Sequence, residues 1–224
     1  DRNASASTRA ANDIASGDLP GPGNPCGRTT PVEVIDDREP SGSDEGRAML
    51  PLVHDLAPGA PLAFADAFTG ETEFADNIRA LAAAGSKVIV DDIGYFAEPA
   101  FQDGVIAQAI NDVTASGATY YSAAGNDNVI SGGNDVASWE APAFRQATSR
   151  PAGSPTYANQ CMDFDPGAGS DSTYGFSIAP GESAGMAPHW AQPQSGVTTD
   201  LDIYMTSGSS VVAASEDSNL TSQK

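Results

Sequence analysis

The most constraining feature of the chain is a regular alternation of helical patterns and short apolar runs between residues 45 and 123. Apolar side chains recur at helical spacing over 45–56, 72–84 and 101–116, and apolar runs occupy 62–68, 87–93 and 118–123. Val88, Ile89 and Val90 are consecutive, which is typical of a strand covered on both faces. Strands that alternate with helices at these lengths form parallel sheets through right-handed crossovers. The sequence therefore predicts an α/β fold built on a parallel sheet.

Single residues set the expected limits of the helices. Glu45 lies at the start of the first helical pattern, and Pro58-Gly59 follows its end and stops it. Thr72 is placed to cap the next helix, and Gly85 is placed to end it. The face of this second helix that we expect to be buried carries Phe74, Ile78 and Leu81.

Residues that directly follow the predicted strands are the first candidates for a functional site. In open parallel sheets, ligands bind beyond the carboxyl ends of the strands. The residues in these positions are Asp91, Asp92 and Gly94 after one strand, and Gly125 and Asn126 after the next. We therefore expect a site in this region to include several of them.

The composition changes after about residue 147. Residues 1–43 are mostly loop, and 148–156 are rich in Ser, Pro and Gly, as in a linker. Short segments of alternating polarity follow, for example around Leu201, Ile203 and Met205, with Gly, Ser and Asp between them. We expect an α/β core over 1–147, a linker over 148–156 and part of an antiparallel β-sandwich over 157–224.

The charge balance excludes nucleic acid as a partner and leaves open whether the protein binds a cation. Acidic residues outnumber basic ones 30 to 10, which gives a net charge of −20. Such a surface repels phosphate backbones, so we expect no nucleic-acid partner. The acidity fits a soluble surface, and some of the carboxylates could instead hold a structural Ca²⁺. No other cofactor is expected.

The cysteines and the hydropathy of the chain bear on metal or redox sites, on a disulfide and on membrane association. Cys26 and Cys161 lie far apart and form no zinc or redox motif, but could form one disulfide in an extracellular protein. No apolar run is long enough to span a membrane, and the first residues lack the pattern of a signal peptide. If the protein is exported, we expect its targeting segment to be absent from this chain.

A turn after the last predicted strand carries a family resemblance. Ala123-Ala124-Gly125-Asn126 resembles the strand-to-turn segment of the subtilisin-like serine peptidases, the subtilases. In that family the Asn side chain helps to hold the oxyanion of the tetrahedral intermediate, where a fixed amide N–H stabilises the developing charge. The resemblance implies that Asn126 is an oxyanion-hole residue. Taken alone, Gly125-Asn126 also fits an ordinary turn.

The order of the preceding segments extends the resemblance over roughly residues 44–145. Glu45 begins a helix where subtilases carry their catalytic histidine, and a Pro-Gly turn and strand follow. The run that ends at Asp92 and Gly94 occupies the place of the strand that flanks the substrate. The resemblance implies a three-layer core with Asp92, Gly94 and Gly125 at the substrate, and it makes 157–224 an inserted β-sandwich. It further implies a secreted endopeptidase that cleaves polypeptides through an acyl-enzyme.

The sequence departs from the subtilase pattern at the general base. Glu45 stands where the family has histidine, and a carboxylate of ordinary pKa near 4.3 accepts protons poorly at neutral pH. Related sedolisins use a glutamate base but place an aspartate one turn later, where this chain has Met49. Glu45 is therefore either the general base or a residue that only favours the helix N-terminus. His54 and His189 are expected to be structural and surface residues.

The nucleophile and the acidic partner are also missing from their expected places. Ser183 lies in the string most similar to the family's serine motif, but the spacing is one residue too long and no helical pattern follows. We therefore expect the serine beyond Lys224. The acidic residue is expected upstream of the chain, with Asp36 or Asp37 as the alternative.

Three functions remain open at this point. The first is a serine endopeptidase that is active only as a longer chain, so that this chain alone is inactive. The second is a catalytically inactive relative that serves as a binding or structural module. The third, a nucleotide-binding domain, lacks both glycine-rich phosphate motifs.

Overall fold

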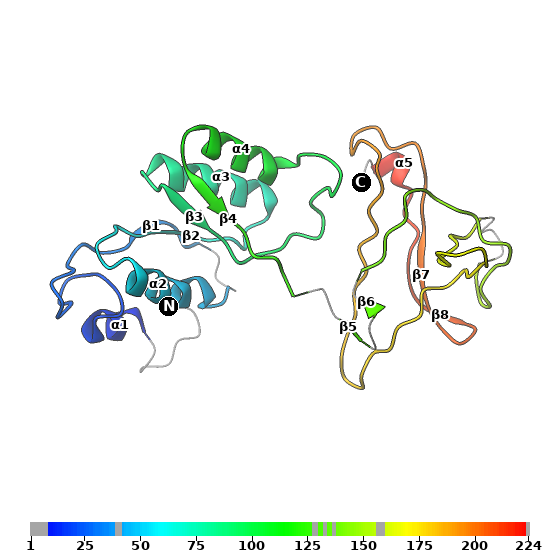
Figure 1. Cartoon of the computed structure of the whole chain (residues 1–224), viewed down its shortest axis with the longest axis horizontal. Helices are drawn as coiled ribbons and strands as arrows, with labels where there is room; N and C mark the ends of the chain where they lie inside the picture. Colours follow the sequence, from blue (N-terminus) through cyan, green and yellow to red (C-terminus); the bar gives the residue numbers. More distant parts are fainter. Residues whose placement is uncertain are drawn as a thin grey trace. The chain divides into compact units, whose positions relative to one another are not determined.

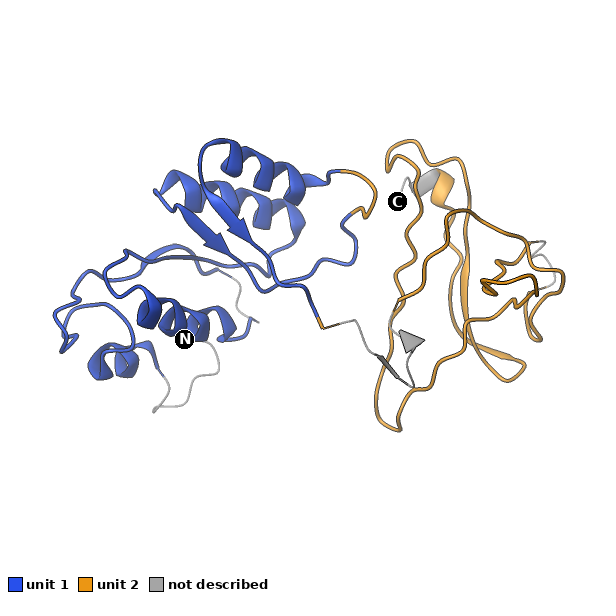
Figure 2. Ribbon diagram, viewed as in Figure 1, with its two compact units in different colours: residues 1–98, 103–125 blue, residues 99–102, 126–224 orange. Residues whose placement is uncertain are grey.

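The computed structural model describes residues 9–38, 42–126, 130–131, 134–135, 138–155 and 160–222 (Figure 1). The chain forms two compact units (Figure 2). Unit 1 comprises Asp1–Glu98 and Asp103–Gly125, and unit 2 comprises Pro99–Gln102 and Asn126–Lys224. The units divide at Gly125, whereas the sequence placed the end of the α/β core at 147. Residues 156–159, at the end of the expected linker and the start of the expected insert, lie outside the described ranges.

Unit 1 holds the predicted parallel strands. Strand β1 (Glu33–Asp36) pairs in parallel with β2 (Ala63–Ala65), and β3 (Val88–Val90) pairs in parallel with β4 (Thr119–Tyr121). Its helices are α1 (Ala10–Ser16), α2 (Glu45–Leu56), α3 (Glu71–Ala83) and α4 (Val105–Ala115). The α/β character with parallel pairing is confirmed, in two small sheets. The finer expectation, a three-layer subtilase-like core, stays a proposal.

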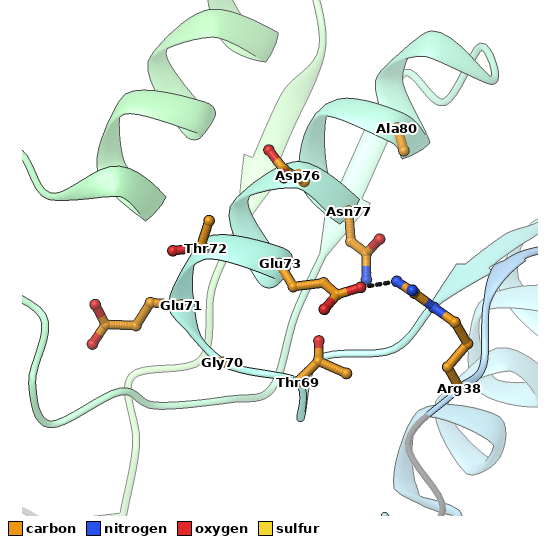
Figure 3. Close-up of a pocket in the computed structure, with 9 residues that line it drawn as sticks. All are labelled: Arg38, Thr69, Gly70, Glu71, Thr72, Glu73, Asp76, Asn77 and Ala80. Carbon is orange, nitrogen blue, oxygen red and sulfur yellow. Dashed lines mark ion pairs between the residues drawn. The ribbon is translucent and has the colours of Figure 1, made fainter.

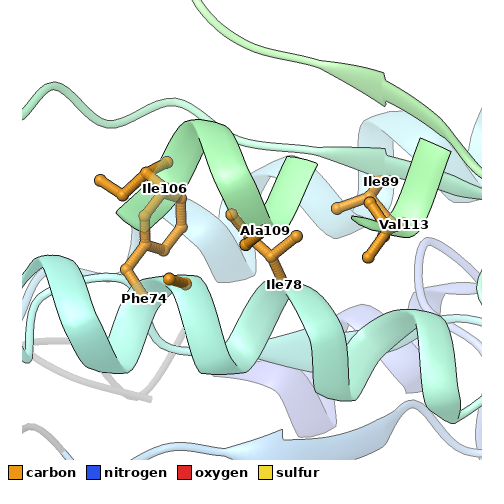
Figure 4. Close-up of a cluster of buried hydrophobic side chains, with 7 residues drawn as sticks. Phe74, Ile78, Ile89, Ile106, Ala109 and Val113 are labelled. Atoms are coloured by element: carbon orange, nitrogen blue, oxygen red, sulfur yellow. The ribbon is translucent and has the colours of Figure 1, made fainter. Parts of the chain in front are cut away.

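The core of unit 1 lies between helices α3 and α4 and strand β3. Phe74 and Ile78 on α3 face Ile106 and Ala109 on α4, as Figure 4 shows. The cluster is completed by Ala75, Ile89 and Val113. The prediction that α3 buries Phe74 and Ile78 is confirmed, and Leu81 packs at the edge of the cluster. Burial of side chains of this size stabilises a fold by about 1.5–3 kcal/mol each.

The expectation that β3 is covered on both faces is wrong: the described residues cover only one face. Ile89 is only 4% exposed, whereas Val88 and Val90 are 64% and 48% exposed. Alternate residues of a strand point to opposite faces, so α3 and α4 cover one face and the other is largely open. An apolar run shows that a strand suits burial, but it does not show that a second layer is present.

The observed bounds of α2 and α3 test the helix limits predicted from single residues. Helix α2 spans Glu45–Leu56, as predicted. A side-chain carbon added to Gly46 would lie 2.8 Å from Phe64 Cε2, so glycine allows α2 to approach β2 closely. Helix α3 begins after Gly70, so the expected cap at Thr72 is wrong. Gly85 has a φ of 103°, which confirms its role after the end of the helix.

Unit 2 is built mainly from loops and short antiparallel pairs. Strand β5 (Ile130–Ser131) pairs with β6 (Asn134–Asp135), and β7 (Ile203–Ser207) pairs with β8 (Ser210–Ser215), before helix α5 (Asn219–Ser222). The antiparallel pairing is present, and the β-sandwich stays a proposal.

Two further expectations concern the cysteines and the membrane. Cys26 and Cys161 are free thiols, so the structure does not contain the disulfide that the sequence left open. Within the described ranges, no helix combines the length and the apolar character needed to cross a bilayer.

Candidate functional site

A groove of about 180 Å³ lies in unit 1, where helix α2 approaches the carboxyl ends of β2 and β3. Helix α2 contributes Glu45, Met49 and Val53 to its lining. The strands and the segments after them contribute Phe64, Asp66, Val90, Asp91 and Asp92. Ligand sites of parallel sheets form at such ends. The volume is below the 300–1,000 Å³ or so that is usual for small-molecule and cofactor sites, so the groove fits a single side chain better than an organic cofactor.

Asp91 ties the ends of β3 and β4 together. Its Oδ1 accepts a hydrogen bond of 2.8 Å from the Ser122 hydroxyl, and its Oδ2 accepts one from the Tyr120 hydroxyl. The Asp91 N–H donates to the Tyr121 carbonyl at 3.0 Å. Burial, together with the neighbouring Asp91 carboxylate, raises the pKa of Tyr120 well above its usual range. Tyr120 therefore stays a neutral hydrogen-bond donor to Asp91.

Glu45 and Asp92 meet at the same groove. Glu45 is the first residue of α2, and Asp92 follows β3; both line the groove and both are exposed. No ion pair joins either carboxylate to a residue in the described part of the chain. The described residues of the lining also include no Lys, Arg or His. The groove is therefore an acidic site with an apolar lining.

A second carboxylate cluster closes the end of β1. Asp36 is buried and accepts hydrogen bonds of 2.7 and 2.8 Å from Arg38, and a third of 3.1 Å from Asn77. The Asn77 amide also donates to the Asp66 carbonyl at 2.8 Å, which links β1, β2 and α3. The Arg38 guanidinium, opposed by burial and helped by Asn77, lowers the pKa of Asp36.

Arg38 also forms an ion pair with Glu73, across an open cavity of about 600 Å³ at the start of α3 (Figure 3). Its lining carries Thr69, Gly70 and Thr72 besides several acidic groups (Figure 3). Since Arg38 is already engaged by two carboxylates, the described lining of this cavity offers no further cation to an anionic ligand. We assign the Asp36 cluster to holding the sheet and α3 together.

The structure brings together two of the five residues that the sequence proposed for the site. Glu45 and Asp92 line the groove, whereas Gly94, Gly125 and Asn126 do not. Gly94 is exposed, and nothing would contact a side-chain carbon there. Gly125 follows β4 with a φ of 75°, as its turn position requires. Asn126 is exposed and belongs to unit 2, so its oxyanion role stays a prediction.

The alternative candidates lie elsewhere. His54 is 2% exposed and lines neither cavity, and His189 is exposed, as expected for structural and surface residues. Ser183 is exposed, and no helix begins at it. Asp36 lies in the buried cluster, and Asp37 lines the groove.

Two contacts of unit 1, one of them at the groove, escaped sequence reasoning. Tyr120 is the partner of Asp91, and the only signal for this was its position on the neighbouring parallel strand. Glu98 accepts a hydrogen bond from the Ala107 N–H in the first turn of α4, and its burial raises its pKa. No sequence pattern pointed to this contact, because eight residues of loop and helix separate the two partners.

Neither a metal centre nor a known relative adds to this picture. Within the described residues, no group of three or more His, Cys, Asp or Glu side chains is placed to hold a metal ion. No family model, no curated protein and no solved structure matches the chain.

Proposed function

We propose that this chain is part of a secreted subtilisin-like serine endopeptidase, and that the groove of unit 1 belongs to the cleft that receives the polypeptide substrate. One observation carries the proposal. Glu45, at the start of α2, and Asp92, after β3, line one groove beyond the ends of parallel strands. The resemblance places the general base and the substrate-flanking strand at these two positions.

The proposed roles follow from the chemistry of each group. Glu45 would accept the proton of the serine nucleophile, which we expect outside this chain. A carboxylate can act as a general base when it lies within hydrogen-bond reach of the proton it removes. Asp92, Gly94 and Gly125 would flank the substrate, and Asn126 would donate to the oxyanion.

The alternative is a binding module without catalysis. It is favoured by the surroundings of Glu45, since Met49 follows one turn later and no described side chain orients the carboxylate. A triad base normally needs such a third group. The groove would then hold a polypeptide without cleaving it.

The test is hydrolysis of an unstructured protein substrate by the polypeptide of the complete reading frame, from pH 3 to pH 8. Glu45→Gln should lower kcat/KM by about 100-fold or more, the usual contribution of a general base. Glu140→Gln is the matched control, because Glu140 is exposed in unit 2. Unchanged activity in Glu45→Gln would contradict the base role. No hydrolysis at any pH would favour the binding module.

A further inference from the structure

We propose that the groove of unit 1 selects a polypeptide segment in which a Lys or Arg side chain neighbours an apolar one. The inference rests on the proposed function, and it names the substrate class of the same site.

The apolar part of the segment is set by the lining of the groove. Met49 and Val53 from α2 face a space that Phe64 and Val90 also line. Val53 and Val90 are 36% and 48% exposed, so apolar surface is accessible rather than sealed in the core. A volume of about 180 Å³ accepts one apolar side chain. Its burial there removes apolar surface of both partners from water.

The basic part of the segment is set by the charge beside this lining. Glu45, Asp91 and Asp92 lie on the groove, and no described residue of the lining is basic. The side-chain donors to Asp91 are two hydroxyl groups, from Tyr120 and Ser122, and neither is a cation. An incoming cation therefore meets a one-sided negative potential, which gives specificity and faster association.

The nearest arginines in the sequence are committed elsewhere. Arg47, two residues after Glu45, pairs with Asp13, and Arg38 pairs with Asp36 and Glu73. The protein thus supplies no cation of its own to the groove from these positions.

Other occupants fit less well. A second copy of the chain would bring another net charge of −20 to an acidic groove. A metal ion is disfavoured because the described carboxylates form no group that could hold one. A peptide that joins an apolar side chain to a basic one satisfies both the lining and the charge.

The test measures binding of short fluorescent peptides to the whole chain by anisotropy. The probes are three hexapeptides of Gly and Ala that differ only in a central Leu-Lys, Leu-Gln or Leu-Glu pair. Leu-Lys should bind most tightly and Leu-Glu most weakly, and added salt should reduce the difference. The double variant Glu45→Gln with Asp92→Asn should weaken Leu-Lys binding by about five- to tenfold, as expected for two exposed charge pairs.

Two controls keep the test specific. Leu-Gln binding should not change in the double variant, which shows that the groove is intact. Glu140→Gln with Glu182→Gln, two exposed residues of unit 2, should not change Leu-Lys binding. Equal binding of the Lys and Glu peptides, no binding of any peptide, or an unaffected double variant would overturn the inference.

The inference and the proposed function can fail separately. Selective binding of Leu-Lys, with no hydrolysis by the complete polypeptide, supports the inference and contradicts the peptidase. Hydrolysis without preference for Lys or Arg supports the peptidase and overturns the inference.

Discussion

The two units differ in what holds them together. Unit 1 has a continuous cluster of buried apolar side chains between α3, α4 and β3. Among the described residues of unit 2, the buried apolar side chains are Ala147 and Val197, and β8 leaves Val211 and Val212 40% and 60% exposed. Hydrophobic burial therefore organises unit 1, whereas local hydrogen bonds carry more of the order in unit 2.

Each unit also contains a buried, hydrogen-bonded aspartate, which makes the contrast sharper. In unit 2, Asp163 Oδ1 accepts the N–H groups of Asp165 and Asp171 at 3.0 and 2.9 Å, and Arg145 lies 3.1 Å from Oδ2. Phe164 packs against Trp139 at a ring distance of 4.7 Å. In unit 1, Asp36 is also buried and hydrogen-bonded, but this unit has in addition a cluster of buried apolar side chains to which Asp36 does not belong.

The largest predicted effect tests the contrast directly. Ile78→Ala should lower the free energy of unfolding of unit 1 by about 2–5 kcal/mol, because it opens a cavity beside Phe74 and Ala109. Val212→Ala should change the free energy of unfolding of unit 2 by less than about 0.5 kcal/mol, because the side chain is exposed. Denaturant unfolding measures both effects, followed by circular dichroism of the helices for unit 1 and by the fluorescence of Trp139 and Trp190 for unit 2. Equal effects would contradict the contrast.

The next effect concerns the hydrogen bond at the edge of the groove. Tyr120→Phe should cost unit 1 about 1–2 kcal/mol, because the Asp91 carboxylate loses a donor. The neighbouring residue provides the control, since Tyr121 is 58% exposed and Tyr121→Phe should be nearly neutral. The same unfolding measurement compares the two. A neutral Tyr120→Phe would show that this bond does not hold β3 and β4 together.

A smaller effect is expected at the end of α3. Gly85→Ala should cost about 1 kcal/mol, because a φ of 103° is unfavourable for a residue with a side chain. Gly94→Ala is the matched change at a glycine with open space around it and no positive φ, and it should have almost no effect on stability. A thermal unfolding midpoint unchanged in Gly85→Ala would contradict the cap assignment.

The smallest effect is a dependence on pH, since both arginine partners are partly exposed and solvent screens them. The Arg38 hydrogen bond lowers the pKa of Asp36, and the Asp171 N–H lowers that of Asp163, in each case below the ordinary 3.8. Each carboxylate therefore stabilises its unit above about pH 4, and this contribution is lost as the pH falls through the lowered pKa.

The two units can be followed separately in this experiment. Trp139 and Trp190 are the only tryptophans of the sequence and belong to unit 2, so their fluorescence reports that unit. Asp163→Asn should flatten the acid dependence of the fluorescence transition, and Asp36→Asn that of the helix transition. The exposed Asp55→Asn should change neither. Identical acid profiles in all variants would contradict the linkage.

The sequence predicted unit 1 better than unit 2 for a physical reason. Apolar side chains at helical spacing, such as Phe74 and Ile78, form the buried face of a helix, so α2 and α3 could be predicted. The parallel strands could be predicted from the apolar runs between the helices. The exposure of Val88 and Val90 was not, because an apolar run does not show which layers are present. Asp92 could be expected at the site from its place after a strand, and Glu45 only from the resemblance to the subtilases. The Tyr120–Asp91 bond depends on strand register, which single-sequence patterns do not give.

The most direct test of the account is to locate the bound peptide by hydrogen exchange of the whole chain with the Leu-Lys probe. We expect protection in the first turns of α2, from Glu45 to Met49, and in the segment from Ile89 to Gly94. Protection confined to residues 160–222, or the same protection pattern with the Leu-Glu peptide at equal concentration, would contradict it.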